Sequence, residues 1–264
     1  MRLIVRDPSR LPQALRDHAE VVAGSHADPT VLDAALTDAD ALFVLVPPNF
    51  AAPEVTEHYL EFARPIAQAV RAHDVSRLVA VSSLGRGFTA PAGLLSSAWA
   101  MDEVLESSGA AYRSLQPPFF MENLLHQVAL IRDQGMFVLP ADPDAPFPAV
   151  ATADIAHEAA RLLTTEWAGQ EGVAVREPVD HTPREMAQVM SQALGEPITY
   201  HRATLGDYRA QYESHGASPA IVDAMVEMAA AQAAGVYPPM TPGGDGTTFA
   251  AWCEAVLAPA LADA

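Results

Sequence analysis

The sequence contains no lysine. Its Lys+Arg total of 15 is therefore arginine alone, set against 33 acidic residues, and the formal net charge is −18. A surface with this balance repels nucleic-acid backbones and anionic membranes. We therefore expect neither nucleic acid nor a membrane among the partners. Without lysine, the chain also lacks every catalytic mechanism that depends on a lysine ammonium group.

Cysteine and long apolar runs are scarce as well. Cys253 is the single cysteine, so a disulfide framework and a cysteine-rich zinc site are both excluded. No His-Glu-x-x-His motif or paired acidic cluster points to another metal. No apolar run approaches the roughly 20 residues that cross a bilayer, and no signal-peptide pattern is present. These features predict a cytoplasmic protein without a metal cofactor, in which Cys253 is a buried helical residue.

A glycine-rich phosphate loop is missing too. A bound dinucleotide presses its pyrophosphate against bare main-chain amides at a helix N-terminus, and only glycines permit that approach. Segment 85–90 (GRGFTA) follows an expected strand but lacks the third glycine and leads into prolines. Segment 244–249 (GDGTTF) follows no expected strand. Neither segment is a dinucleotide-binding fingerprint.

Strand-like and helix-like patterns alternate through the first 117 residues. Apolar strands are expected at 2–5, 19–24, 40–46, 77–83 and 111–117, and helices at 8–17, 28–36, 54–73 and 97–108. This alternation is typical of βαβ units. The predicted fold class is therefore α/β, with a doubly wound, mostly parallel sheet in a first domain of residues 1–150.

Residues 151–264 are predicted to form a smaller, mainly helical lobe on the substrate side, with some segments returning to the sheet. Among its expected elements are a helix capped by Thr182 and Glu185 and ended by Gly195, and a helical hairpin over 205–235. A hairpin strand is expected just before this lobe, at 135–140.

Five segments together resemble a known family. They read VRDPSRL, DADALFVLVPP, RLVAVSSLG, GAAYRSLQPPFFMENLL and TADIAHEAARLL, and they are similar to the NmrA-like atypical short-chain dehydrogenases. PPFFMEN and DIA are the most specific pieces. That family includes NAD(P)H-dependent reductases and nicotinamide-sensing regulators. The resemblance therefore implies a Rossmann-like fold and NADP or NAD as the cofactor.

The resemblance also implies that residue 1 lies one βα unit into the usual domain. In the family, the segment similar to VRDPSRL follows a first strand, a glycine-rich turn and a helix. That first strand is central in the order 3-2-1-4-5-6, so we expect a gap of roughly 9–10 Å unless its neighbours close up. Two explanations stay open: a truncated or misassigned start, or true loss of the phosphate-binding element. Ser25 occupies a position where relatives commonly carry an aspartate near the adenine. This difference favours the second explanation, loss of the phosphate-binding element.

Three residues are candidate catalytic groups. Ser82 and Ser83 end the strand on which the family's serine would lie. His126 is expected near the cleft, where a histidine can act as acid and base at neutral pH. Each also has an ordinary structural interpretation, as a strand-end serine or an exposed histidine. Classical short-chain dehydrogenases use a tyrosine–lysine pair, which a chain without lysine cannot form.

Binding residues are implied by the same resemblance. The cofactor candidates are Arg6 at the adenosine end and the turn residues Val46, Pro47 and Pro48; the substrate candidates are Phe88, Trp99, Phe119, Phe120, Asn123 and Tyr208. The alternatives are that the rings belong to the core, that Tyr208 packs against Tyr212, and that Asn123 caps a helix over 122–132. Glu122, Asn123 and His126 are expected on one side of that helix.

Three functions remain compatible with these residues. The first is NAD(P)H-dependent reduction of a small carbonyl, enone or quinone compound. The second is a cofactor-free, non-redox enzyme such as a cyclase, isomerase or dehydratase. The third is a non-catalytic nucleotide-sensing or regulatory protein. The expected partners are a small-molecule substrate and, in a homodimer, a second copy. The arginine- and alanine-rich usage is typical of GC-rich bacterial genomes, in which such proteins often serve specialised metabolism.

Overall fold

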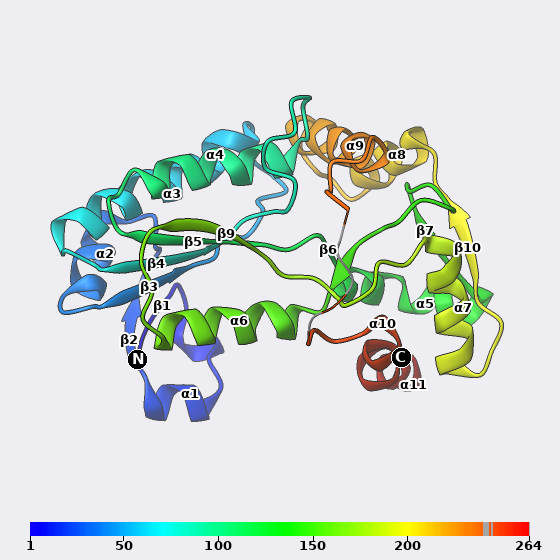
Figure 1. Ribbon diagram of the computed structural model, residues 1–264, viewed down its shortest axis with the longest axis horizontal. Helices are drawn as coiled ribbons and strands as arrows, with labels where there is room; N and C mark the ends of the chain where they lie inside the picture. The colour runs from blue at the N-terminus through cyan, green and yellow to red at the C-terminus, as the bar shows by residue number, and fades with distance from the viewer. Residues whose placement is uncertain (240–242, 244, 264) are drawn as a thin grey trace.

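Parallel strands dominate the first part of the chain in a computed structural model, which describes residues 1–239, 243 and 245–263 (Figure 1). The main sheet has the order β3-β4-β5-β9, and β1 and β2 form a separate parallel pair. The strands concerned are β1 (Arg2–Val5), β2 (Glu20–Ala23), β3 (Ala41–Val44), β4 (Arg77–Val81), β5 (Ala111–Gln116) and β9 (Gln170–Ala174). All of their pairings are parallel, so the predicted fold class is confirmed.

Helices cover both faces of the main sheet, as Figure 1 shows, with α3 and α4 on one side and α6 on the other. The helices of the sheet region are α1 (Gln13–His18), α2 (Pro29–Leu36), α3 (Val55–Ala72), α4 (Leu94–Glu106) and α6 (Thr152–Thr164). Because both faces are covered, central strands read as continuous apolar runs. Leu78, Val79 and Ala80 of β4 have 0% of their surface exposed.

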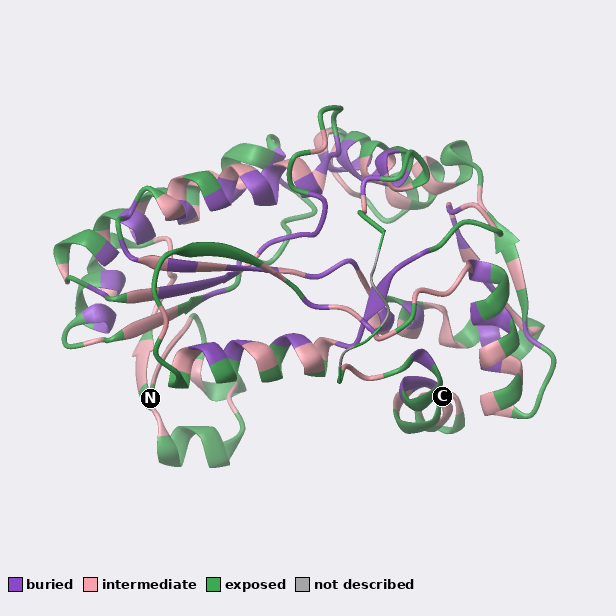
Figure 2. Ribbon diagram, in the orientation of Figure 1, coloured by how far each residue is buried: buried purple, intermediate pink, exposed green. Residues whose placement is uncertain are grey.

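The sheet is divided between β1 and β3, where the sequence predicted a gap. Within the described residues, β1 pairs with β2 alone and β3 with β4 alone. We call the region between β1 and β3 the junction. Its β3 side carries two large apolar side chains at the surface, with Phe43 37% and Leu45 54% exposed. In Figure 2 this end of the sheet is pink and green, whereas β4 and β5 contain buried segments.

Most of the remaining elements form a second cluster at the other end of the molecule (Figure 1). They are β6 (Phe119–Phe120), the 3-10 helix η2 (Met121–Gln127), α5 (Val128–Gln134), β7 (Met136–Leu139), β8 (Ala149–Val150), α7 (Pro183–Leu194), β10 (Thr199–Arg202), α10 (Phe249–Trp252), the π-helical turn η3 (Cys253–Leu257) and α11 (Ala258–Ala262). Helix α9 (Pro219–Ala233) packs instead on the main core beside α3 and α4, and α8 (Leu205–Ser214) packs on α9. Because α6 and β9 pack into the sheet region, part of the chain beyond residue 150 returns to it. The predicted domain boundary stays a prediction.

The structure contains the helix ends and the helical hairpin that the sequence predicted. Thr182 and Glu185 form a reciprocal capping box, and Gly195 ends α7 in the left-handed conformation at φ 72°. Helices α8 and α9 form the helical hairpin predicted over 205–235. Caps of this kind satisfy backbone groups that the helix itself leaves unpaired. These local signals were sufficient because they depend on neighbouring residues only.

Three local predictions were wrong. The predicted helix 8–17 is divided into η1 (Pro8–Arg10) and α1, because Pro12 lacks an N–H and precedes the α-helical turn. The helix predicted over 122–132 is η2 followed by α5. Strand β7 is not part of a hairpin, because it pairs in parallel with β10, which lies some 60 residues later in the chain.

Carboxylates that accept hydrogen bonds attach the C-terminal segment to the rest of the chain. Asp154 accepts hydrogen bonds from the amide and hydroxyl of Thr247, both at 2.8 Å. Glu177 accepts from the Phe249 amide at 3.1 Å, and Glu122 from the indole N–H of Trp252 at 3.2 Å. The following Cys253 is 0% exposed, as predicted, and burial raises the pKa of its thiol to about 12.

No helix among residues 1–239 and 245–263 is both long and apolar enough to cross a membrane.

Candidate functional site

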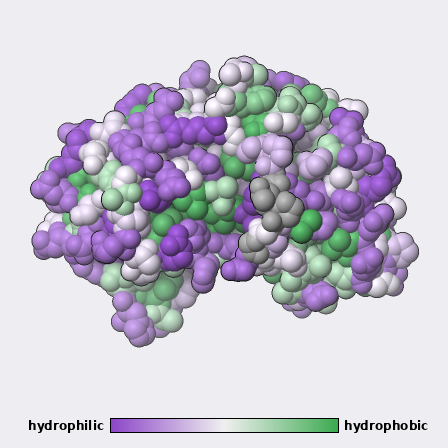
Figure 3. Space-filling model, in the orientation of Figure 1, coloured by the Kyte–Doolittle hydropathy of each residue, from purple (hydrophilic) through white to green (hydrophobic). Residues whose placement is uncertain are grey.

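The carboxyl ends of the parallel strands define the candidate site. In open α/β sheets, ligands bind at this edge, where the strand order changes direction. Arg6 follows β1, His26 follows β2, the 46–48 turn follows β3, Ser82 and Ser83 follow β4, and the pair Phe119 and Phe120 follows β5. In Figure 3, apolar surface gathers in the middle of the face shown, between the sheet region and the C-terminal elements.

At the junction end of this edge, Arg6 lies near a histidine that sequence reasoning missed. Arg6 is exposed, and its charge helps to lower the pKa of His26. Burial is the larger cause of that lowering, whereas a hydrogen bond with the Leu45 backbone acts in the opposite direction. The His26 ring packs on Phe62 at a centroid distance of 4.5 Å, and its buried Nε2 has no hydrogen-bond partner among the described residues. Neutral His26 and charged Arg6 thus lie together at the predicted adenosine end.

The turn after β3 is only partly available to a ligand. Val46 is 5% exposed and belongs to the main core, whereas Pro47 and Pro48 are exposed. The Pro47 carbonyl lies 3.0 Å from Nε2 of His58. Of the three predicted turn residues, the structure therefore leaves the two prolines at the surface.

Ser82 belongs to a buried polar network centred on Asp102. Its Oγ donates to Oδ2 of Asp102 at 2.7 Å, Ser114 Oγ donates to the same oxygen at 2.9 Å, and the Tyr112 hydroxyl donates to Oδ1 at 2.5 Å. Asp102 is 0% exposed, and burial raises its pKa although the three hydroxyls favour the charged form. The network holds α4 against β4 and β5. The catalytic role predicted for Ser82 stays a prediction.

Ser83, Trp99 and Phe88 lie together on the α4 side of the edge. Ser83 is 7% exposed, and its carbonyl accepts the Trp99 indole N–H at 3.0 Å. Trp99 and the half-buried Phe88 pack in a small apolar cluster with Val236. Phe88 and Val236 also line a cavity of about 710 Å³ beside β9. Phe88 is thus a cavity residue, and Trp99 is a packing residue.

The segment after β5 places its predicted residues in different environments. Phe119 packs on Phe147 at a centroid distance of 5.1 Å, and Phe120 packs against a separate cluster under α6. Both rings are half-buried, so the alternative in which the rings contribute to the core holds in part. Asn123 and His126 are exposed and three residues apart, which places them on one face of a 3-10 helix.

Two expectations for η2 were wrong. Asn123 does not cap a helix, because the residues before η2 and α5 are Phe120 and Gln127. Glu122 does not accompany His126, because its carboxylate turns inward and accepts the Thr152 amide at 3.0 and 3.1 Å. The 3-10 geometry separates them, since it returns to the same face after three residues and not four.

Tyr208 and Tyr212 face each other on α8. Their hydroxyl oxygens are 3.3 Å apart, their rings are 5.1 Å apart, and both pack on the main core. Burial raises the pKa of both hydroxyls. Tyr212 also stacks on Phe50, the exposed end of the turn after β3, at 6.2 Å. The packing alternative for Tyr208 therefore holds, and its predicted substrate role stays a prediction.

The fit of a nicotinamide dinucleotide differs along the edge. The resemblance assigns Arg6 and the 46–48 turn to the adenosine end, and Phe119, Phe120 and Asn123 to the other end, and these assignments stay predictions. A pyrophosphate between them requires glycine amides at a helix N-terminus. Gly93 precedes α4, but a Cβ there would overlap the Ala224 carbonyl, so α9 occupies its open side. Gly85 is packed in the same way on Val236. Neither of these two glycines therefore offers open main-chain amides to a pyrophosphate. Gly244 of the 244–249 segment lies outside the described residues.

No group of three or more His, Cys, Asp or Glu side chains suited to a metal occurs in the part of the chain that the structure covers.

Fold and edge geometry together define a Rossmann-like nucleotide-binding class, and comparison with known proteins identifies the family. Residues 1–166 match the family described as NAD(P)H-binding. The chain is 26% identical over 227 residues to an NAD(P)H azoreductase of Xenophilus azovorans, which covers 86% of this chain and 77% of that protein. It is 30% identical over 203 residues to a (4-alkanoyl-5-oxo-2,5-dihydrofuran-3-yl)methyl phosphate reductase of Streptomyces griseus, covering 76% and 67%. The chain therefore belongs to the NAD(P)H-binding family, and the NmrA-like resemblance is confirmed.

Solved structures support the same fold. An NADPH-dependent quinone oxidoreductase of Escherichia coli, solved with NADPH, has a TM-score of 0.73 at 22% identity and covers 99% of this chain and 89% of its own. A nucleoside-diphosphate-sugar epimerase of Staphylococcus aureus has a TM-score of 0.81 at 15% identity, covering 96% and 90%. At these identities the likeness concerns the fold.

Proposed function

We propose that this protein is an NAD(P)H-dependent reductase of a small carbonyl, enone or quinone compound. The observation that carries the proposal is the common edge at which Arg6, the 46–48 turn and Phe119 to Asn123 follow parallel strands of a family that binds NAD(P)H. The relatives named as reductases of an azo compound, a quinone and a furanone phosphate support the reaction type.

Each end of the cofactor is assigned different residues in this proposal. Arg6 would bind the adenosine end, because an exposed guanidinium can pair with a ribose phosphate. Phe119 and Phe120 would flank the nicotinamide or the substrate, and Asn123 would hydrogen-bond at the mouth of the site. His126 is exposed and lies on the same face of η2 as Asn123, and we assign it the proton donor's role.

Thermal melting with NADPH or NADH, followed by assay of 1,4-benzoquinone reduction, tests the proposal. A ligand at 100 times its Kd stabilises the folded state by about 2.7 kcal/mol, so millimolar cofactor should raise Tm clearly. Arg6→Gln should weaken NADPH binding about tenfold and NADH binding less. Arg10→Gln, an exposed arginine in the same segment, is the matched control. Equal effects of both substitutions, or no stabilisation by either cofactor, would contradict the proposal.

The packing of Gly85 and Gly93 against Val236 and Ala224 at this edge favours a second candidate, the cofactor-free, non-redox enzyme. That enzyme would use the same edge for its substrate, with the aromatic and prolyl side chains as walls. It predicts no change in Tm with millimolar NADPH or NADH, together with stabilisation by a neutral cyclic enone such as 2-cyclohexenone. A cofactor-induced increase in Tm excludes this candidate.

A further inference from the structure

A groove at the other end of the molecule is lined by two arginines in a strongly acidic protein. It has a volume of about 680 Å³ and lies among α7, β10 and the loop that contains Pro143. Figure 1 shows α7 and β10 at the opposite end from β1, β2 and β3, and no residue that lines the groove belongs to the candidate site. Its volume falls within the usual range for small-molecule sites. Nothing described above gives this groove a role.

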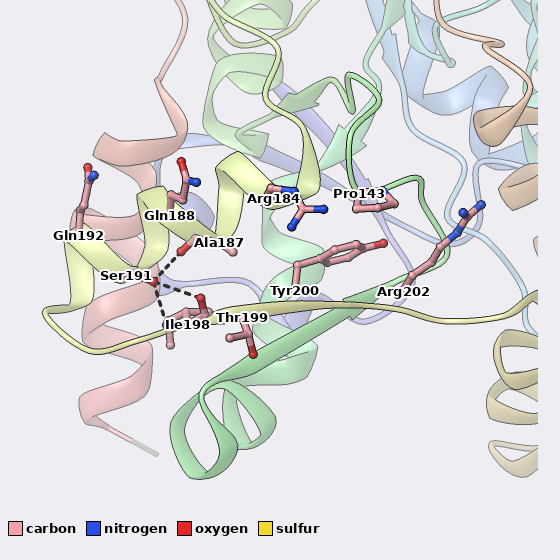
Figure 4. Close-up of a pocket in the computed structure, with 10 residues that line it drawn as sticks. All are labelled: Pro143, Arg184, Ala187, Gln188, Ser191, Gln192, Ile198, Thr199, Tyr200 and Arg202. Carbon is pink, nitrogen blue, oxygen red and sulfur yellow. Dashed lines mark hydrogen bonds between the residues drawn. The ribbon is translucent and has the colours of Figure 1, made fainter.

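The lining of the groove combines two arginines with an apolar base. Arg184 comes from the first turn of α7 and Arg202 from the end of β10, and no acidic residue lines the groove. Figure 4 shows Arg184 on the α7 side of the Tyr200 ring and Arg202 on the other side. Ala187 and Ile198 are buried residues of the lining on the α7 side. This arrangement suits an anionic group attached to a flat apolar body.

Tyr200 is held rigidly in this groove. Its hydroxyl lies 2.8 Å from the Leu139 carbonyl and 2.6 Å from the Ala141 carbonyl, and its ring packs on Phe137 at 5.3 Å. Burial raises the pKa of Tyr200 to about 12, so the hydroxyl remains a neutral donor. The ring is therefore a fixed apolar wall, and binding against it costs little additional side-chain entropy.

Both guanidinium groups keep free donors. Arg184 contacts Asp144 through Nε at 2.8 Å and Nη2 at 3.4 Å, which leaves Nη1 unused. Arg202 approaches Asp142 only to 3.6 Å through Nη1. The side chains of both arginines and both aspartates are about half exposed or more. Exposed ion pairs of this kind contribute little, so a ligand oxyanion can add to them or replace them.

We propose that this groove binds a small organic anion, a phosphate or carboxylate on a flat apolar body, with Arg184 and Arg202 as its anion contacts and Tyr200 as its apolar wall. The aspartates compete with such a ligand for the same guanidinium groups. Binding should therefore respond in opposite directions when an arginine and when an aspartate is removed. A site that depended only on net charge would not show this residue-specific pattern.

Calorimetric titration with phenyl phosphate at low salt tests the proposal, with inorganic phosphate and phenol as separate arms. Phenyl phosphate should bind more tightly than either, because each comparison probe lacks one half of the recognised chemistry. Arg184→Gln or Arg202→Gln should weaken binding at least about tenfold. Arg209→Gln should leave it unchanged, because Arg209 is similarly exposed and pairs with Asp223, and neither residue lines the groove.

The aspartate variants keep the test valid if an arginine variant misfolds. Asp144→Asn should tighten phenyl phosphate binding by up to about fivefold, and Asp223→Asn should not change it. Equal tightening in both variants would overturn the proposal, because net charge alone would then explain binding. No tightening in Asp144→Asn, or equal binding of inorganic phosphate and phenyl phosphate, would overturn it as well. Melting curves of every variant report whether the fold is intact.

Discussion

Strands β3 and β4 are neighbours with similar sequences and different environments. Both are apolar runs, ALFV and RLVAV, and they pair with each other in parallel. Strand β4 has a partner on each side and contains residues with 0% exposure, whereas β3 has a partner on one side and leaves Phe43 37% exposed. The comparison teaches that the burial of an apolar strand depends on its neighbours in the sheet, and that the junction lacks the packing of the closed sheet.

The largest effect should separate these two strands directly. Leu78→Ala in β4 removes a fully buried side chain and should lower the free energy of unfolding by about 2–5 kcal/mol. Leu45→Ala, at the end of β3, removes a side chain that is 54% exposed and should cost less than about 1 kcal/mol. Urea denaturation of both variants measures the difference. Similar losses would mean that the junction is packed as tightly as the closed sheet.

A second effect of about 3 kcal/mol concerns the polar network inside the closed sheet. Asp102→Ala leaves the hydroxyls of Ser82, Ser114 and Tyr112 without their acceptor, and unsatisfied buried donors are costly. Denaturation at constant pH measures this loss. Ser108→Ala, another buried serine near α4, is the control and should cost less.

The pH dependence of Asp102 has a definite sign. Because its folded pKa is raised above 3.8, the folded state holds the proton more tightly than the unfolded state. The corresponding stability is present below pH 3.8 and is lost as the pH rises through the folded pKa. Asp102→Asn should remove this decline. A decline that persists in Asp102→Asn would assign it to another group.

The smallest effect, about 1 kcal/mol or less, is expected at the junction and has the opposite sign. Burial lowers the folded pKa of His26 below 6.5, so the unfolded state binds the proton more tightly. Stability is therefore complete above pH 6.5 and falls as the pH decreases through the lowered pKa. His26→Phe keeps a ring on Phe62 and should flatten the stability profile between pH 8 and pH 5. An unchanged slope would show that His26 is well solvated.

The alternation of strands and helices was predictable from the sequence because each element depends on its own periodicity and caps. The capping box at Thr182 and Glu185 is one example. The division between β1 and β3 was also predictable, since the strand order follows from the resemblance and the strands were recognised individually. The pairing of β7 with β10 was not, because some 60 residues separate them and no local signal encodes a distant partner.

The candidate site was predictable only as a set of positions. Strand ends placed Arg6, the 46–48 turn and Phe119 at one edge, and the structure has them there. Directions of side chains were not predictable: Ser82 turns inward to Asp102, and Glu122 turns inward to Thr152. For Ser82, the available signal in the sequence was Asp102, an aspartate in the helix that lies between strands carrying serines and a tyrosine. That signal becomes informative only once the strands are placed side by side.

By itself, the sequence determined the α/β class and the family, because periodicity, caps and short motifs are local properties of the chain. The strand order came with the family resemblance that those motifs carry. Only the tertiary structure decided which carboxylates are buried, which aromatic rings reach the surface and that Arg184 meets Arg202 across a groove. Those outcomes depend on distances between residues far apart in the chain, and such distances exist only after the elements have packed.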